Sequence, residues 1–288
     1  MDNYTIFRLK LLKGLGNKGR LKALAYSKNH ELKFEEGLFL EQLLGIQPRY
    51  RHKFQQSLID VQDMSEEDYL SFVEQTGFVT ILDADYPEQL LEIYNPPIAL
   101  FYQGDISLLQ KNMLSVIGSR EQTTFGKEMI DHIVPHLVNE DIVIVSGLAK
   151  GNDTYAHKTA IRHRGQTVGV LGSGHNYIYP KDNQHLQTYM AEHQLVLSEY
   201  FPHEKPLAYH FPERNRIIAG LSKGTIVIES KEKSGTFITA QLALEEGRDV
   251  FAIPNQPFCM ESTGCLNLIK DGAKITTCAE DILEELIN

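Results

Sequence analysis

Glycine turns with basic neighbours recur from residue 118 onward, each just after a run of β-branched residues. The N–H groups of such turns, and of helices that begin after them, bind phosphate oxygens, and an arginine adds two parallel hydrogen bonds. Aromatic residues stand between the basic ones, where they would stack on unpaired bases. The candidate residues for contact with a nucleic-acid strand are Gly118, Ser119, Arg120, Gly147, Lys150, Gly151, Lys181, Phe211, Arg214, Asn215 and Arg216.

The arginines among these residues also have a structural interpretation, which the sequence leaves open. Arg120 would then form a salt bridge at a strand end. Arg214 and Arg216 are two residues apart on an expected helix and cannot share one of its faces. One of them would then pair with a carboxylate at a strand end, such as Glu199 or Glu229.

A structural role and a functional role are also the alternatives for residues of the expected helix after Gly151 and for the aromatic residue Phe211. Asn152 and Asp153 stand where side chains cap the first turn of a helix, and we expect them to do so. His157 lies on the same helix beside an alanine, and we expect a packed histidine rather than a catalytic base. Phe211 is either a stacking platform for bases or part of the core.

Other classes of site do not fit the sequence. Gly172-Ser173-Gly174 lacks the third glycine of a dinucleotide fingerprint, and no helix is expected to start after it, since His175, Asn176, Tyr177 and then Pro180 follow. Gly14 and Gly19 have the glycine spacing of an ATP-binding P-loop, but Arg20-Leu21 stands where Lys and Ser or Thr are required. Three cysteines without a CxxC pair and scattered histidines predict neither a disulfide framework nor a metal site. We therefore expect no cofactor.

From about residue 111 onward, strand-like and helix-like segments alternate regularly, and these segments must position the glycine turns. Apolar, β-branched runs occupy 114–119, 141–147, 167–174, 194–200, 224–230 and 249–254. Helical patterns occupy 124–140, 153–164, 182–193, 213–222, 236–247 and 279–288. This alternation predicts an α/β fold with a doubly wound, Rossmann-like and mostly parallel sheet, covered by helices on both faces. The turns would converge because ligands bind at the carboxyl ends of parallel strands.

The first part of the chain has helical patterns and no strand signals. This predicts a separate small all-α domain, residues 1–75, before the domain of residues 79–288. Its LLKGLGNKG segment is similar to the turns of helix–hairpin–helix or sterile-alpha-motif-like modules, where glycines serve either helix packing or DNA contact. Residues 1–60 carry 11 Lys/Arg and 6 Asp/Glu, a net charge of +5. Residues 61–110 carry 10 acidic and no basic residues and read as a solvated face or a linker.

The net charge and the hydropathy of the chain indicate which kinds of partner it can bind and in which cell compartment we expect it. The whole chain has a net charge of −10, which argues against a protein that coats DNA by bulk electrostatics and favours a local basic site. No apolar run approaches the length of a membrane span, and the first residues do not have the pattern of a signal peptide. We therefore expect a cytoplasmic protein without a membrane partner.

Motifs in a fixed order resemble the DNA-processing protein A family, also called DprA or Smf. Over about residues 79–278 the chain contains VIGSR, SGLAKGNDTYAH, VLGSGHNYIYPKDN, LSEYFPHEKP, HFPERNRIIAGLS, ESKEKSGTFITAQLALEEGRDVFAIP and STGCLNLIKDGA. The resemblance implies a homodimeric binder of single-stranded DNA in natural transformation, which protects incoming DNA and loads the RecA recombinase onto it. It also implies DNA contacts from Arg120, Lys181 and the FPERNR segment.

Two expectations concern catalysis and assembly. Related Rossmann-like nucleotide phosphoribohydrolases carry a glutamate in the turn that corresponds to residues 233–239, where this chain has Thr239, so we expect no enzyme. Leu266 and Ile269 lie three residues apart on a short helix, and Ile275 follows on an expected edge strand. These three residues form the candidate dimer interface. Alternatively, the same apolar stripe packs on the sheet.

Overall fold

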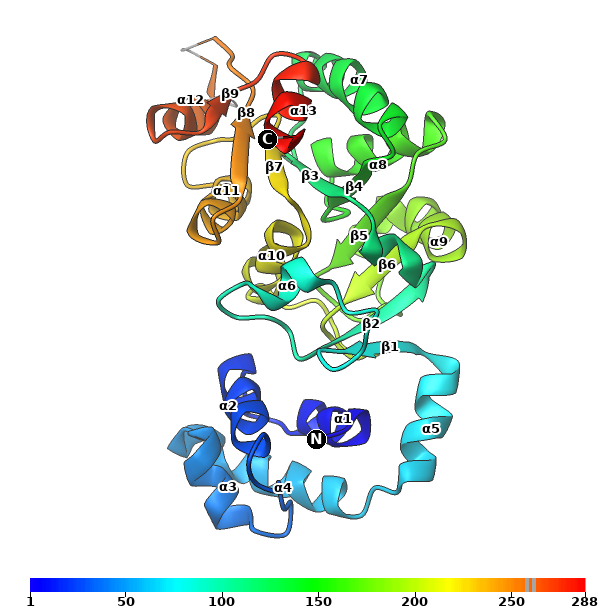
Figure 1. The fold of residues 1–288 in the computed structure, drawn as a ribbon, viewed down its shortest axis with the longest axis vertical. Helices are drawn as coiled ribbons and strands as arrows, with labels where there is room; N and C mark the ends of the chain where they lie inside the picture. The colour runs from blue at the N-terminus through cyan, green and yellow to red at the C-terminus, as the bar shows by residue number, and fades with distance from the viewer. Residues whose placement is uncertain (257–258, 261–262, 288) are drawn as a thin grey trace. The chain divides into compact units, whose positions relative to one another are not determined.

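The computed structural model describes residues 1–256, 259–260 and 263–287, and its chain divides into two compact units (Figure 1). The first unit contains Met1–Tyr86 with Pro97–Leu100, and the second contains Pro87–Pro96 with Phe101–Asn288. Among the helices of the described residues, none combines the length and the apolarity that crossing a membrane requires.

The first unit is helical, as its sequence predicts. Its elements are α1 (Asn3–Leu11), α2 (Asn17–Ser27), α3 (Gly37–Leu44), the 3₁₀ helix η1 (Pro48–Tyr50), α4 (Arg51–Gln62), α5 (Glu66–Gln75) and the strand β1 (Gly77–Thr80). Asp2 caps α1 by accepting a hydrogen bond from the Thr5 N–H at 2.8 Å, and Ser65 and Asp68 form a capping box at α5. The acidic segment that follows residue 60 is therefore folded and is not a linker.

The glycine turn between α1 and α2 serves helix packing. Gly14 has a φ of +73°, a conformation that other residues rarely adopt, and it lets the chain reverse between the two helices. A Cβ atom on Gly19 would lie 2.2 Å from a methyl carbon of Leu15 and 3.0 Å from the carbonyl oxygen of Leu44. Gly19 thus allows α2 to approach the end of α3 closely.

The second unit has the alternating order that the sequence predicts. Its elements are α6 (Glu88–Leu91), β2 (Ala99–Gly104, which begins in the first unit), η2 (Ile106–Gln110), β3 (Met113–Ile117), α7 (Thr124–Asn139), β4 (Val143–Ser146), α8 (Asn152–Arg162), β5 (Thr167–Leu171), η3 (Lys181–Asn183), α9 (Gln184–His193), β6 (Leu195–Ser198), α10 (His210–Leu221), β7 (Gly224–Val227), α11 (Gly235–Glu245), β8 (Asp249–Ala252), α12 (Thr263–Lys270), β9 (Lys274–Ile275) and α13 (Glu280–Ile287).

Within the described residues, nine strands form one sheet in the order β1-β2-β6-β5-β4-β3-β7-β8-β9. Strands β3 to β9 pair in parallel, whereas β2 pairs with β6 in antiparallel orientation. The chain builds outward from β3 through β4, β5 and β6, and then returns to the other side of β3 with β7. This confirms the doubly wound, mostly parallel fold and places its switch point between β3 and β7.

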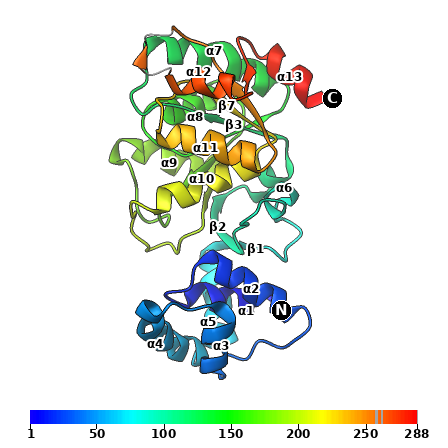
Figure 2. The ribbon, with the colours of Figure 1, turned by 90° about the vertical axis from the view of Figure 1, so that its left-hand side faces the viewer.

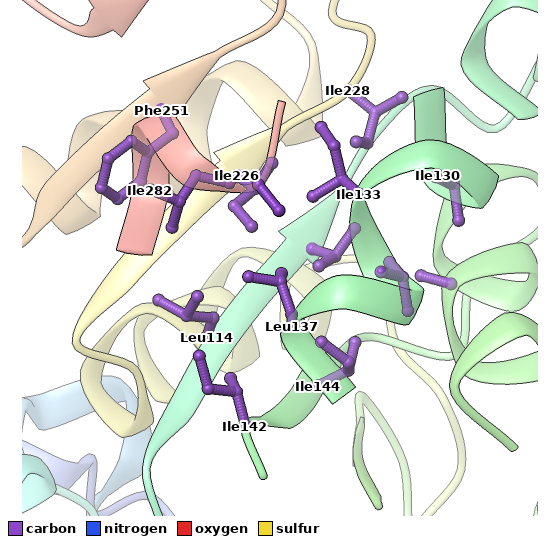
Figure 3. Packing of buried hydrophobic residues seen from close by; sticks show 14 of the residues in the cluster. Leu114, Ile130, Ile133, Leu137, Ile142, Ile144, Ile226, Ile228, Phe251 and Ile282 are labelled. Carbon is purple, nitrogen blue, oxygen red and sulfur yellow. The ribbon is translucent and has the colours of Figure 1, made fainter. Parts of the chain in front are cut away.

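Alternating side chains of β3 show how both faces of the sheet are covered. Leu114 and Val116 belong to an apolar core with α7, α8 and α13, of which Figure 3 shows ten labelled members. Ser115 points to the opposite face, where its hydroxyl donates to the carbonyl oxygen of Ile218 in α10 at 2.8 Å. Figures 1 and 2 show α7 and α8 on one side of the sheet and α10 and α11 on the other.

Candidate nucleic-acid interface

A cleft of about 730 Å³ opens at the switch point. Its walls come from the loop after β3, the loop after β7 with the first turn of α11, and the first half of α10. Its volume is typical of a ligand-binding pocket, and its position is where open α/β sheets bind ligands. The predicted residues that line the cleft are Gly118, Ser119, Arg120, Phe211, Arg214 and Asn215. Those that do not line it are Gly147, Lys150, Gly151, Lys181 and Arg216.

Arg120 is the exposed cation of the loop after β3. Within the described part of the chain, its guanidinium makes neither a hydrogen bond nor an ion pair, so the strand-end salt bridge is not formed. Its guanidinium carbon lies 6.0 Å from the centre of the Phe211 ring. Among the described residues, the side chain can therefore bind a phosphate without breaking a hydrogen bond or an ion pair of the fold.

The first turn of α11 faces the same space. The Thr236 hydroxyl donates to the carbonyl oxygen of Gly118 at 2.9 Å, which ties this turn to the loop after β3. Ser234 is the N-cap and accepts from the Phe237 N–H at 3.1 Å. The N–H groups of Gly235 and Thr236, at the first two helical positions, make this helix end attractive to an anion. These residues lie outside the predicted set, although Ser-Gly-Thr before a helical pattern is an N-cap signal.

Arg214 lies at the back of the cleft and is only 4% exposed. Its Nη1 donates to the carbonyl oxygens of Gly147, at 2.6 Å, and of Val170, and its Nε donates to Asn215 Oδ1 at 3.2 Å. A Cβ atom on Gly147 would lie 2.6 Å from both terminal guanidinium nitrogens, so a larger residue at this position would displace the guanidinium of Arg214. Burial lowers the pKa of Arg214 to about 10, which leaves it cationic at neutral pH.

Arg216 is buried and does not line the cleft. Its Nη2 lies 2.8 Å from each carboxylate oxygen of Glu199, and its Nη1 donates to the carbonyl oxygen of Glu213 at 3.1 Å. The carboxylate pairing that the sequence left open for one arginine therefore belongs to Arg216. Its guanidinium fixes α10 against the end of β6 rather than lining the cleft.

The start of α8 differs from the capping prediction, which was wrong. Gly151 is the N-cap, with a φ of +80°, and a Cβ atom there would lie 2.3 Å from the Ser119 carbonyl oxygen. Asp153 turns back to the preceding loop, where its Oδ2 accepts from the N–H groups of Gly147 at 3.2 Å and Ala149 at 3.4 Å. Asn152 is fully buried and donates to Glu229 at 2.9 Å instead.

Glu229, just beyond β7, is buried and connects two helix starts through hydrogen bonds. From the sequence it was expected only as a possible partner of an arginine. Besides Asn152, it accepts hydrogen bonds from the N–H of Thr123, at 3.2 Å, and from the hydroxyl of Thr123. Thr123 is the N-cap of α7, and Asn152 is the first residue of α8. One carboxylate therefore joins the starts of two helices that flank the Arg120 loop.

Two lysines of the predicted set lie outside the cleft lining. Lys150 forms an ion pair of 2.5 Å with Asp182, and both side chains are exposed. Lys181 is exposed on η3, two residues beyond the cleft residue Tyr179. Both lysines remain candidates for contact with a strand that extends past the cleft. An exposed ion pair such as Lys150–Asp182 contributes little and exchanges easily.

Two aromatic rings form one wall of the cleft. Tyr179 is 49% exposed, and its ring centre lies 5.3 Å from that of Phe211 at an interplanar angle of 48°. Phe211 is half-buried and packs over Gly172, where a Cβ atom would lie 2.8 Å from the ring. Phe211 is therefore a cleft residue and not plain core. An unpaired base entering the cleft would meet these rings.

His157 is fully buried, as expected for a packed histidine. Its Nδ1 lies 2.6 Å from the Thr167 hydroxyl, and burial lowers its pKa to about 3, so the ring is neutral at physiological pH. Across the residues that the structure describes, no group of three or more His, Cys, Asp or Glu side chains is placed to hold a metal ion.

Fold and cleft together define a doubly wound α/β protein with a cleft at its switch point, lined by arginines and aromatic rings. The sequence model of the family DNA recombination-mediator protein A matches residues 77–287, and the chain belongs to this family. The DNA processing protein DprA of Streptococcus pneumoniae is 44% identical over 99% of this chain and 98% of its own length. The DprA of Bacillus subtilis is 46% identical over 72% of this chain and 70% of its own length.

Two solved structures support the fold. The X-ray structure of DprA from Streptococcus pneumoniae matches with a TM-score of 0.89 and 42% identity, over 99% of this chain and 98% of that chain. A structure of DNA processing protein A from Helicobacter pylori matches with a TM-score of 0.66 and 28% identity, over 73% of this chain and 96% of that chain. The latter work describes a single-stranded DNA binding mode for the Helicobacter protein.

Proposed function

We propose that this protein binds single-stranded DNA in the switch-point cleft and acts as a recombination mediator in natural transformation. The observation that carries the proposal is the Arg120 guanidinium, which has no polar partner among the described residues and lies beside the aromatic wall of Phe211 and Tyr179. A guanidinium suits a phosphate, and exposed rings suit bases that are not already stacked in a duplex. The single-strand binding described for the Helicobacter relative supports the same assignment.

The charge distribution limits how such binding would work. The chain as a whole is acidic, so affinity must come from a few focused contacts rather than from a broad basic surface. With about three phosphates neutralised, the logarithm of the binding constant would fall with the logarithm of salt concentration at a slope of roughly −2. The proposed contacts are Arg120, the first turn of α11 and Lys181.

The finer parts of the proposal concern assembly and the recombinase. Family membership supports protection of incoming DNA and loading of RecA by a homodimer. Leu266 and Ile269 are half-buried on α12, and Ile275 is 59% exposed on the edge strand β9, as a dimer contact would require. We propose binding rather than catalysis, since residue 239 is a threonine whose hydroxyl donates to Gly235 at 3.0 Å.

Fluorescence anisotropy with a labelled oligothymidylate strand tests the binding proposal. The parent protein should bind this strand, and unlabelled duplex of the same length should compete poorly. The double variant Arg120→Ala/Lys181→Ala should lose detectable binding while keeping its fold, whereas Arg162→Ala, a paired surface arginine on α8, should bind normally. Equal affinity for duplex and single strand would contradict the proposal. RecA-dependent ATP hydrolysis on the strand, with and without this protein, tests the loading step.

A further inference from the structure

An ion pair joins the two loops that meet at the switch point. Lys231 Nζ, in the loop after β7, lies 2.6 Å from Glu121 Oε2, in the loop after β3. Strands β3 and β7 are neighbours in the sheet and pair in parallel, so these loops leave the same edge side by side. Both residues line the cleft, and their side chains are 38% and 76% exposed. The pair therefore lies where the cleft is open to solvent.

Glu121 contributes little to the stability of the fold, because an exposed pair of a lysine and a carboxylate is weak in water. The hydrogen bond from Lys231 lowers the pKa of the Glu121 carboxyl, so this group is charged at neutral pH. A negative charge that directly follows Arg120 in the cleft lining opposes the binding of a polyanion. The carboxylate therefore has its main effect on the ligand and not on the fold.

Lys231 can exchange its partner at little cost. Its ammonium group ends a flexible four-carbon chain and has three donors, which suit a carboxylate and a phosphate alike. The backbone of Lys231 is held separately, since its carbonyl oxygen accepts from the Ser230 hydroxyl at 3.1 Å and from the Ser234 N–H at 3.3 Å. The ammonium can therefore turn to another anion while the loop keeps its conformation. A strand held at Arg120 would present its phosphates in the same cleft at a high effective concentration.

We propose that Lys231 is a phosphate-binding residue held in reserve: Glu121 occupies its ammonium group in the free protein and yields it to a phosphate of the bound strand. Glu121 is thus an internal competitor that lowers the affinity for single-stranded DNA. This inference rests on the proposed single-strand binding and divides the cations of the cleft into two kinds. Arg120 is accessible in the free protein, whereas Lys231 becomes available by exchange of its partner. The competitor favours release of the strand, which suits its transfer to a recombinase.

Three single variants test the exchange by anisotropy titrations with labelled oligothymidylate. Glu121→Gln, which keeps the size and removes the charge, should bind about two- to fivefold more tightly, the range for an exposed ion pair. Lys231→Gln should bind about fivefold more weakly or worse, because a charge-assisted hydrogen bond to the strand is lost. Asp141→Asn is the matched control and should bind as the parent does. Asp141 pairs with Lys111 at the amino ends of the strands, and these side chains are 80% and 34% exposed.

The salt dependence and the double variant separate an exchange of partners from simple repulsion. Lys231→Gln should make the salt slope shallower by about 0.7, because one phosphate contact is lost. The tightening that Glu121→Gln causes should largely disappear in the Lys231→Gln background, since no ammonium is left to release.

Three outcomes would overturn the exchange. The first is unchanged or weaker binding by folded Glu121→Gln, and the second is an unchanged salt slope in Lys231→Gln. The third is an equally large tightening by Glu121→Gln in the Lys231→Gln background, because Glu121 would then act by repelling the strand. Failure of the parent protein to bind oligothymidylate at all would instead refute the proposed function.

Discussion

Arg120 and Arg216 are both basic residues of the family motifs, but Arg120 is exposed at the cleft and Arg216 is buried against Glu199, so their alanine variants should behave differently. Arg120 is exposed and without a polar partner among the described residues, so Arg120→Ala should change the free energy of unfolding by less than about 0.5 kcal/mol. It should weaken single-strand binding by about 1.5–3 kcal/mol, the range for a hydrogen bond to a charged group. The salt slope should become shallower by about 0.7, because one phosphate contact is lost.

Arg216→Ala should show the reverse pattern. This change removes the arginine partner of buried Glu199, which typically costs about 3–5 kcal/mol of stability. Urea unfolding measures the stability of both variants, and anisotropy at several salt concentrations measures binding by the folded protein. If Arg216→Ala were as stable as the parent and bound DNA more weakly than Arg120→Ala, the assignment of these two residues would be wrong.

Four further outcomes are expected. Phe211→Ala should weaken single-strand binding by about 1–3 kcal/mol in anisotropy titrations, and a large loss of thermal stability with normal binding would return Phe211 to the core. Ile269→Glu should give a folded monomer in light scattering, a prediction that fails if the parent is itself monomeric at micromolar concentration. Because the pKa of buried His157 is lowered to about 3, the unfolded chain alone takes up its proton below pH 6.5. The free energy of unfolding should therefore fall by about 1 kcal/mol between pH 6 and pH 5 through this residue, and urea titrations of His157→Gln should lack that contribution. Limited proteolysis should nick the chain between α5 and α6 and leave a stable larger fragment, whereas resistance there would indicate an indivisible domain.

The strands and helices of the second unit could be predicted from the sequence because both are strongly periodic. Strands β3, β4, β5, β6 and β7 are buried along their whole length, and the doubly wound topology follows from the alternation of strands with helices. The contact of Arg120 with the cleft could be predicted for the same reason, since it directly follows the end of a central strand.

Side-chain partners within the loops could not be predicted, because they depend on contacts between residues far apart in the sequence. Asp153 is at a helix start and has the composition of a cap, but the positive φ of Gly151 directs it to the loop amides instead. The choice between Arg214 and Arg216 as partner of Glu199 was decided by helix rotation against β6, which spacing alone does not specify. Glu229 has no local signal for its link to two helix starts.

Photo-crosslinking tests the central claim, that a single DNA strand lies in the switch-point cleft, most directly. A strand containing 5-iododeoxyuridine is irradiated with the parent protein, and the crosslinked residues are identified by mass spectrometry. Because iodouracil reacts with aromatic rings that it stacks on, crosslinks to Phe211 and Tyr179 are predicted, and Arg120→Ala should reduce their yield. Crosslinks confined to residues outside the cleft, with none to these two rings, would contradict the account.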